Sequence, residues 1–127
     1  MKSKLEIYAL SVCFASVVCL VISAGIAGYS IFEITAPELT MNSYRYDKYQ
    51  TNEAFWKSEV SCSKEKQTEV KPDEEALTKQ RLAAFAVEVK AEKREGAQTL
   101  VRCFMFILVS GIALFIHWKI AKKSRAS

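Results

Sequence analysis

Hydrophobic residues are concentrated in two blocks near the ends of the chain. Residues 7–32 contain no Asp, Glu, Lys, Arg or His, and residues 103–118 contain His117 as their one member of that set. A helix that crosses a membrane needs about 20 mostly apolar residues, because it rises about 1.5 Å per residue through a core of about 30 Å. The first block and residues 100–120 both meet this length, with Arg102 close enough to one end to reach the headgroups. The pattern therefore predicts two transmembrane helices.

We expect an all-α membrane protein, a two-span transmembrane helical hairpin with a largely helical segment between the spans. The first span is expected to remain as an anchor rather than to be cleaved as a signal peptide, because its apolar run continues to Phe32. The expected parts are a cytoplasmic N-terminus (1–6), transmembrane helix 1 (7–33), an extracytoplasmic helical segment (34–99), transmembrane helix 2 (100–120) and a cytoplasmic basic tail (121–127).

The charges predict the orientation of the hairpin. Residues 33–101 hold 13 of the 14 acids but 11 of the 18 bases, whereas lysine and arginine dominate both ends. Because basic residues favour the cytoplasmic side, we expect both termini in the cytoplasm and the middle segment outside. Lys90, Lys93 and Arg94 weigh against this orientation, although neighbouring glutamates offset them.

The segment between the spans contains several helix signals. Thr35 with Glu38 forms a capping box, which predicts a helix through residues 39–49, and a second start is expected at Thr51. Residues 61–71 are polar and without apolar period, which indicates a loop. Strong helix formers follow, so that one continuous helix over residues 73–122 is possible, with Gly96 as its one breaker before the second span.

Two groups of apolar residues in the middle segment predict packing. Leu82, Phe85 and Val89 form a stripe with helical spacing, expected to pack against the helix after Thr35 or to dock a partner subunit. The aromatic residues predict either a small packed cap or contact with the headgroups. They are Tyr44, Tyr46, Tyr49, Phe55 and Trp56.

Small residues recur along one face of each span. Because small side chains let membrane helices approach closely, these faces are candidates for helix packing, either between the two spans of one chain or with another subunit. The candidates are Ala9, Cys13, Ser16, Ser23, Ala27 and Ser30 in the first span and Ser110 and Gly111 in the second.

Few side chains suggest chemistry, and we expect no enzyme. Arg102, His117 and Trp118 are placed near the ends of the second span and are expected to be interface anchors. Cys62, alone in the middle segment, is a candidate for an intermolecular disulfide. No cofactor or metal is expected, because the four cysteines and the single histidine lack metal-ligand spacing. Haem ligation would require His117 from two chains.

Residues 109–119, which end in His117-Trp118-Lys119 after a charged stretch at 93–95, resemble a hairpin of uncharacterised bacterial membrane proteins. In that family a transmembrane helix ends in His-Trp followed by a basic residue. The resemblance covers about 25 residues, and the family has proline where Ala113 stands. It implies a bacterial inner-membrane protein and an anchoring role for His117 and Trp118, with no activity.

These observations favour an accessory or scaffolding subunit of a larger membrane complex, acting through helix packing. Its expected partners are the lipid bilayer and another membrane protein or copies of itself, with no nucleic acid. One alternative is a homo-oligomeric channel or small transporter, in which Ser11, Ser16, Ser23 and Ser30 would line a polar path. A remote alternative is a haem-binding redox subunit using His117.

Overall fold

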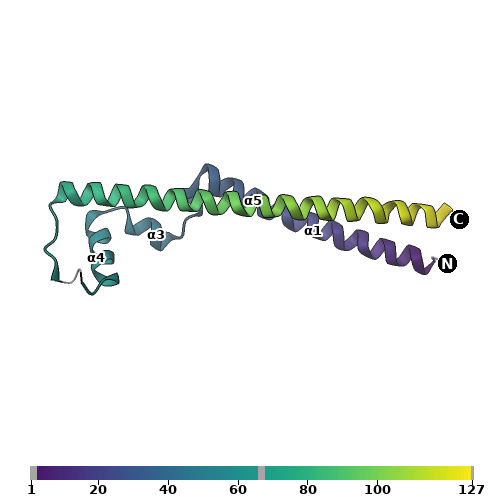
Figure 1. Ribbon diagram of the computed structural model, residues 1–127, viewed down its shortest axis with the longest axis horizontal. Helices are drawn as coiled ribbons and strands as arrows, with labels where there is room; N and C mark the ends of the chain where they lie inside the picture. Colours follow the sequence, from purple (N-terminus) through teal and green to yellow (C-terminus); the bar gives the residue numbers. More distant parts are fainter. Residues whose placement is uncertain (1–2, 66–67, 127) are drawn as a thin grey trace. The chain divides into compact units, whose positions relative to one another are not determined.

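The computed structural model describes residues 3–65 and 68–126. These residues form helices and no strand (Figure 1), which confirms the all-α prediction. The helices are α1 (Lys4–Thr35), α2 (Pro37–Thr40), α3 (Ser43–Lys48), α4 (Asn52–Cys62) and α5 (Glu74–Ala126). Both α1 and α5 are long and apolar enough to cross a membrane.

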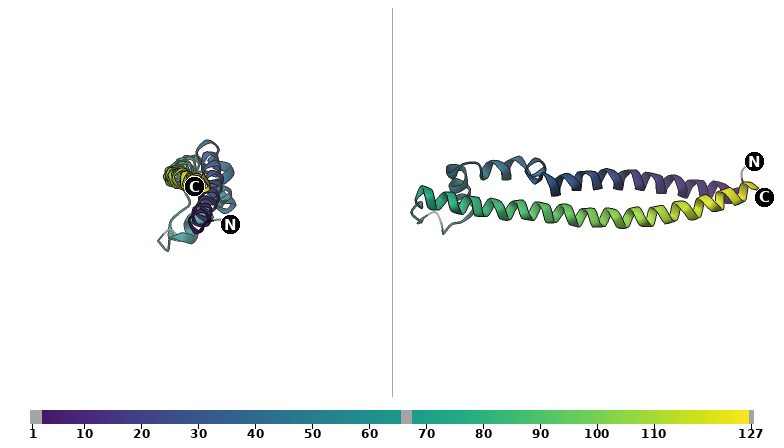
Figure 2. Two further views of the ribbon diagram at one scale, coloured as in Figure 1. Left: turned by 90° about the vertical axis from the view of Figure 1, so that its right-hand side faces the viewer. Right: turned by 90° about the horizontal axis from the view of Figure 1, so that it is seen from above.

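The chain divides into two compact units. The first, which we call the helix pair, comprises Met1–Ile31 and Gly96–Ser127, and the second, the middle unit, comprises Phe32–Glu95. In the helix pair, the first residues of α1 lie beside the last residues of α5, so that the two segments run antiparallel (Figure 2). In the middle unit, Tyr46 of α3 and Asn52 of α4 contact the first turns of α5 through their side chains.

The start of the middle unit differs from the expected capping box. Thr35 ends α1, and Ala36 rather than Thr35 occupies the N-cap of α2, with no side-chain hydrogen bond. The Ala36 amide still bonds to Phe32 O at 2.7 Å, whereas Pro37 has no N–H with which to continue the α1 ladder. The expected helix through residues 39–49 is also interrupted, because Met41 has extended backbone angles between α2 and α3.

The later helix starts agree with the sequence signals. Thr51 caps α4 by accepting a hydrogen bond from the Ala54 amide, as the expected second start requires. The helix continues to Cys62, so the loop begins two residues later than predicted. Glu74 and Glu75 lie in the first turn of α5, where carboxylates interact favourably with the helix dipole.

The last helix is one continuous element of 53 residues. It begins and ends close to the expected continuous helix of residues 73–122 and passes through Gly96 without a break. Glycine lowers helix propensity by about 1 kcal/mol, and its conformational freedom is not used here, since no described glycine has a positive φ. Gly96 is buried.

Candidate functional site

The inner face of the helix pair is built from small and polar side chains. On α1 the buried residues recur at intervals of three, four or seven, as they do along a seam between two helices. The segment of α5 from Gly96 contributes buried Cys103 and Ala121, with Ser110 and Gly111 half-buried. The buried α1 residues are Glu6, Ala9, Cys13, Ser16, Ser23 and Ser30, and Ala27 is half-buried.

Polar contacts join the two segments near the chain ends. Arg125 Nε donates to Glu6 Oε1 at 2.7 Å, and the hydroxyls of Ser3 and Ser124 lie 2.7 Å apart. Glu6 is buried although it is charged, so the guanidinium compensates for a carboxylate that has lost water. These contacts fix the register of α1 against α5 at this end.

His117 lies in the same inner face. Its Nδ1 is 2.8 Å from Ala113 O, one turn earlier on α5, and its ring meets Tyr8 of α1 edge-on at 5.8 Å between centroids. The histidine is half-buried. Its ring therefore packs across the seam against Tyr8, a pairing that was not predicted from the sequence.

Ser30 is the most enclosed polar residue of the seam. Its side chain is fully buried, and Oγ has no hydrogen-bond partner. Cys13, by contrast, directs its thiol toward Leu114 O across the seam at 3.9 Å. The seam thus consists mainly of close van der Waals packing with few polar links between residues 9 and 31 of α1.

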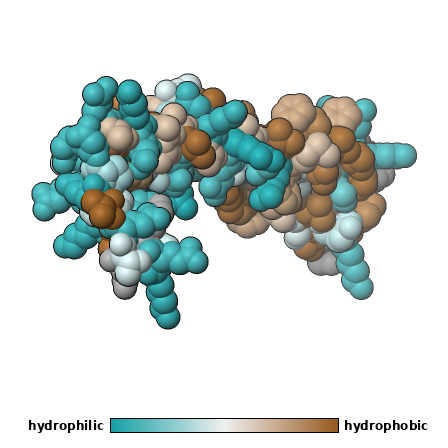
Figure 3. Space-filling view, turned by 60° about the vertical axis from the view of Figure 1, so that its left-hand side comes forward, coloured by the Kyte–Doolittle hydropathy of each residue, from teal (hydrophilic) through white to brown (hydrophobic). Residues whose placement is uncertain are grey.

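The outer face of the helix pair is covered by large apolar side chains (Figure 3). Phe14, for example, is 73% exposed, and Val21 is 67% exposed. A soluble protein rarely exposes contiguous apolar surface of this kind. This surface therefore needs lipid or another apolar helix to cover it.

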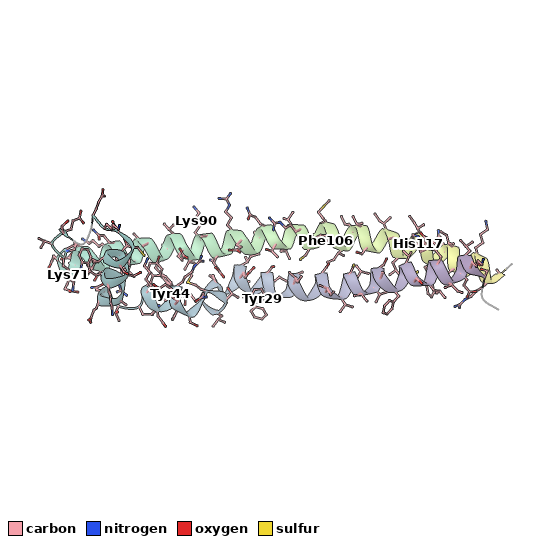
Figure 4. The ribbon with its side chains drawn as sticks, turned by 90° about the horizontal axis from the view of Figure 1, so that it is seen from below. Tyr29, Tyr44, Lys71, Lys90, Phe106 and His117 are labelled. Atoms are coloured by element: carbon pink, nitrogen blue, oxygen red, sulfur yellow. The ribbon has the colours of Figure 1, made fainter. Side chains whose placement is uncertain are left out.

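The aromatic and basic residues at the expected interfaces point outward. Trp118 is 58% exposed, and Arg102 is also exposed. Tyr29, near the other end of the α1 apolar run, lies on the side away from α5 (Figure 4). Their outward position suits contact with the headgroup region.

The middle unit has a compact aromatic cluster. Phe85 of α5 contacts the rings of Tyr46 and Tyr49 at 6.5 and 5.6 Å between centroids, and Tyr49 also contacts buried Phe55 of α4. Leu77 is fully buried. Of the expected stripe, Phe85 therefore packs against Tyr46 of α3 and Tyr49 directly after it, Val89 is half-buried, and Leu82 is exposed.

Polar side chains of α5 tie the short helices to it. Arg81 Nη1 donates to both Tyr49 O and Gln50 O at 2.8 Å, and Asn52 Nδ2 donates to Glu74 Oε2 at 2.8 Å and to Thr78 Oγ1 at 2.9 Å. These contacts were not predicted from the sequence. Polar residues at positions 74, 78, 81, 88 and 92 share a face of α5 with three-, four- and seven-residue spacing, but this pattern does not indicate their partners.

Two ion pairs shift pKa values in this unit. Burial disfavours the charged form of Lys48, but the hydrogen bond to Glu59 and attraction to nearby groups outweigh it and raise the pKa of Lys48. At the start of α5, the hydrogen bond from Asn52 and the contact with Lys71 lower the pKa of Glu74. Both pKa shifts favour the charged forms, protonated Lys48 and deprotonated Glu74, and these are the forms that make the ion pairs.

Residues with metal or redox chemistry do not converge. In residues 3–65 and 68–126, no group of three or more His, Cys, Asp or Glu side chains could hold a metal ion. Cys62 ends α4 with an exposed, unpaired thiol. Its thiol is accessible to a second chain, and the intermolecular disulfide stays a prediction.

Comparison with known proteins gives no family. No protein-family model, no curated protein and no solved structure matches the chain.

Proposed function

We propose that this chain is a two-span hairpin of the bacterial inner membrane with both termini cytoplasmic, and that it is an accessory subunit of a larger membrane complex. The helix pair would span the bilayer, and the middle unit would lie outside it. The observation that supports this proposal most directly is the contrast between the two faces of the helix pair. Small side chains pack inward, and large apolar ones face outward.

This contrast favours docking over chemistry. Small inner residues allow α1 and α5 to approach closely, which leaves the bulky outer surface available to lipid or to helices of a partner. In the middle unit, exposed Leu82 and Val87 add apolar surface on α5. A partner with a membrane domain and an external domain could cover both surfaces.

The channel alternative has less support. Ser16, Ser23 and Ser30 are buried within one helix pair, and the exposed Ser11 hydroxyl bonds back to Ile7 O at 2.9 Å. A polar path between copies would require these hydroxyls to leave the seam. The haem alternative would require a second chain, because His117 is the one histidine of the sequence.

The test is purification of the tagged full chain in a gentle detergent, followed by mass analysis of the intact assembly. We expect a stoichiometric second, larger protein. Repetition with Cys62→Ser, which removes the exposed thiol, should leave that protein bound if helix packing holds it. A single species at several multiples of 14.3 kDa of protein would overturn the accessory role and indicate a homo-oligomer.

A further inference from the structure

A groove runs between α1 and α5 of the helix pair toward the basic end of α5. Its apolar part has a volume of about 510 Å³ and is lined by Val17, Gly111, Leu114, Phe115 and Trp118. A second hollow of about 260 Å³ shares Trp118 and extends to Lys122 and Arg125. The lining therefore changes from apolar to basic at Trp118.

The length of this groove matches one leaflet of a bilayer. Gly111, Trp118, Lys122 and Arg125 are spaced by seven, four and three residues, so they lie on one face of α5. Gly111 is next to the centre of the expected span, residues 100–120. The distance from Gly111 to Lys122 along the helix is about 16 Å, close to half of a hydrocarbon core of about 30 Å.

We propose that this groove binds one anionic phospholipid of the cytoplasmic leaflet. An acyl chain would lie along residues 111–118, and the headgroup phosphate would contact Lys122 and Arg125. The inference rests on the proposed membrane placement, and it adds a specific lipid class and a site to it.

Charge complementarity selects an anionic headgroup. Glu6 is the only acid in residues 1–31 and 96–127, and its Oε1 accepts from Arg125 Nε at 2.7 Å. A guanidinium has five N–H donors, so this bond orients Arg125 and leaves further donors for a phosphate. Lys122 is exposed, and Lys119 Nζ lies 4.5 Å from the Phe115 ring centre beside the groove. Three cationic side chains, Lys119, Lys122 and Arg125, therefore lie at this end of the helix pair. The one carboxylate there, that of Glu6, is already paired with Arg125.

Gly111 is half-buried at the edge of the seam and lines the groove, so a side chain added there would enter the groove. A Cβ at Gly111 would meet no heavy atom within 4 Å, and the same is true at Gly25 on α1. Gly111→Leu should therefore fold and block the acyl chain, with Gly25→Leu as its matched control. Lys122→Gln removes a headgroup contact, and Lys4→Gln removes an equivalent charge from the other terminus as its control.

The experiment is native mass spectrometry of the full chain, purified from membranes in a gentle detergent. Each variant is titrated with phosphatidylglycerol, with phosphatidylcholine of the same acyl chains, and with inorganic phosphate. Helix content is checked by circular dichroism. We expect the wild type to bind phosphatidylglycerol several-fold more tightly than phosphatidylcholine, as charge recognition requires.

The variants separate the two parts of the site. Gly111→Leu should lose binding of both lipids, whereas Lys122→Gln should weaken phosphatidylglycerol binding about fivefold and phosphatidylcholine binding less, because the choline cation of that lipid already compensates its phosphate. The controls Gly25→Leu and Lys4→Gln should behave as the wild type. Equal binding of the two lipids, equal effects of control and test variants, or displacement of the lipid by phosphate alone would overturn the proposal.

These outcomes are distinguishable from failure of the proposed function. A chain recovered without detergent in the soluble fraction would refute the membrane placement, and the lipid site with it. A chain that requires detergent but shows no preference for phosphatidylglycerol would refute the lipid site alone.

Discussion

Among single residues, Arg81 of the middle unit bonds to two successive carbonyls of the chain. One nitrogen, Nη1, donates to the carbonyls of Tyr49 and Gln50, which follow α3 directly. Hydrogen bonds from charged groups contribute about 1.5–3 kcal/mol each when buried, and one of these two is exposed. We therefore predict that Arg81→Gln destabilises the end of α3 by about 1–2 kcal/mol. Hydrogen exchange of the α3 amides would measure this loss as faster local opening.

The matched control for Arg81 is Lys79→Gln. Lys79 forms an exposed pair with Glu75 on the same helix, and such pairs contribute a few tenths of a kcal/mol. Exchange that accelerates equally in both variants would contradict the role assigned to the Arg81 bonds.

His117 provides a second test at this scale. Its ring packs edge-on against Tyr8, and aromatic pairs contribute about 0.5–1.5 kcal/mol beyond their area. His117→Ala should therefore weaken the helix pair by no more than about 1.5 kcal/mol and leave it folded, while His117→Phe should retain most of that stability. Denaturation by sodium dodecyl sulfate, followed by circular dichroism, would compare them. Collapse of both variants would point instead to an essential polar role for the imidazole.

Among helical elements, the seam between α1 and α5 depends on the size of its side chains. Ser23 is buried in the seam, whereas neighbouring Ala24 is exposed. Overpacking a tight interface costs about 1–3 kcal/mol, so Ser23→Leu should weaken association of α1 with α5 by that amount. Ala24→Leu adds similar bulk on the outer face and should have little effect. If the detergent denaturation curves of the two variants coincide, the size of the side chains in the seam does not determine how tightly α1 and α5 associate.

The first turn of α5 should respond to acid. The pKa of Glu74 is lowered by the hydrogen bond from Asn52 and by Lys71, so its contribution to stability is complete above the ordinary glutamate value of 4.5. That contribution is lost as the pH falls through the lowered pKa, because the protonated carboxyl attracts Lys71 less. The Asn52 side-chain amide resonances should shift in this pH range. Glu74→Gln should abolish the shift, and Glu75→Gln should preserve it.

The sequence predicted the helices better than it predicted their junctions. The recurrence of small residues marked five of the six buried α1 residues and missed Glu6, and Thr51 identified the start of α4. The prediction for the junction after α1 was wrong. Thr35 remains inside the α1 hydrogen-bond ladder, so it is not available as a cap. Asn42, which caps α3 by accepting from the Tyr44 amide, was detectable as a capping residue. The Arg81 contacts were not detectable from the sequence, because they depend on how the segment that follows α3 folds back against α5.

For the whole molecule, the central question is on which side of a membrane the middle unit lies. Basic residues at both ends favour a cytoplasmic location for the termini, and the helix pair brings the start of α1 and the end of α5 together. A hairpin with paired ends requires that both termini share one side. Under the proposed placement, the opposite side of the membrane would carry the middle unit, in which Cys62 is the only cysteine of the sequence.

Cysteine labelling tests this orientation directly. Cys62 is exposed at the end of α4, while Cys13 and Cys103 are buried and Cys19 faces outward from the apolar part of α1. In intact spheroplasts, a membrane-impermeant maleimide should therefore label the wild type at Cys62 and fail to label Cys62→Ser. Adding Ala126→Cys to Cys62→Ser places a thiol at the exposed end of α5, which should react only after permeabilisation. The opposite labelling pattern would mean that the basic ends face outward. The glutamates beside Lys90 and Lys93 would then not cancel the preference of those lysines for the cytoplasmic side.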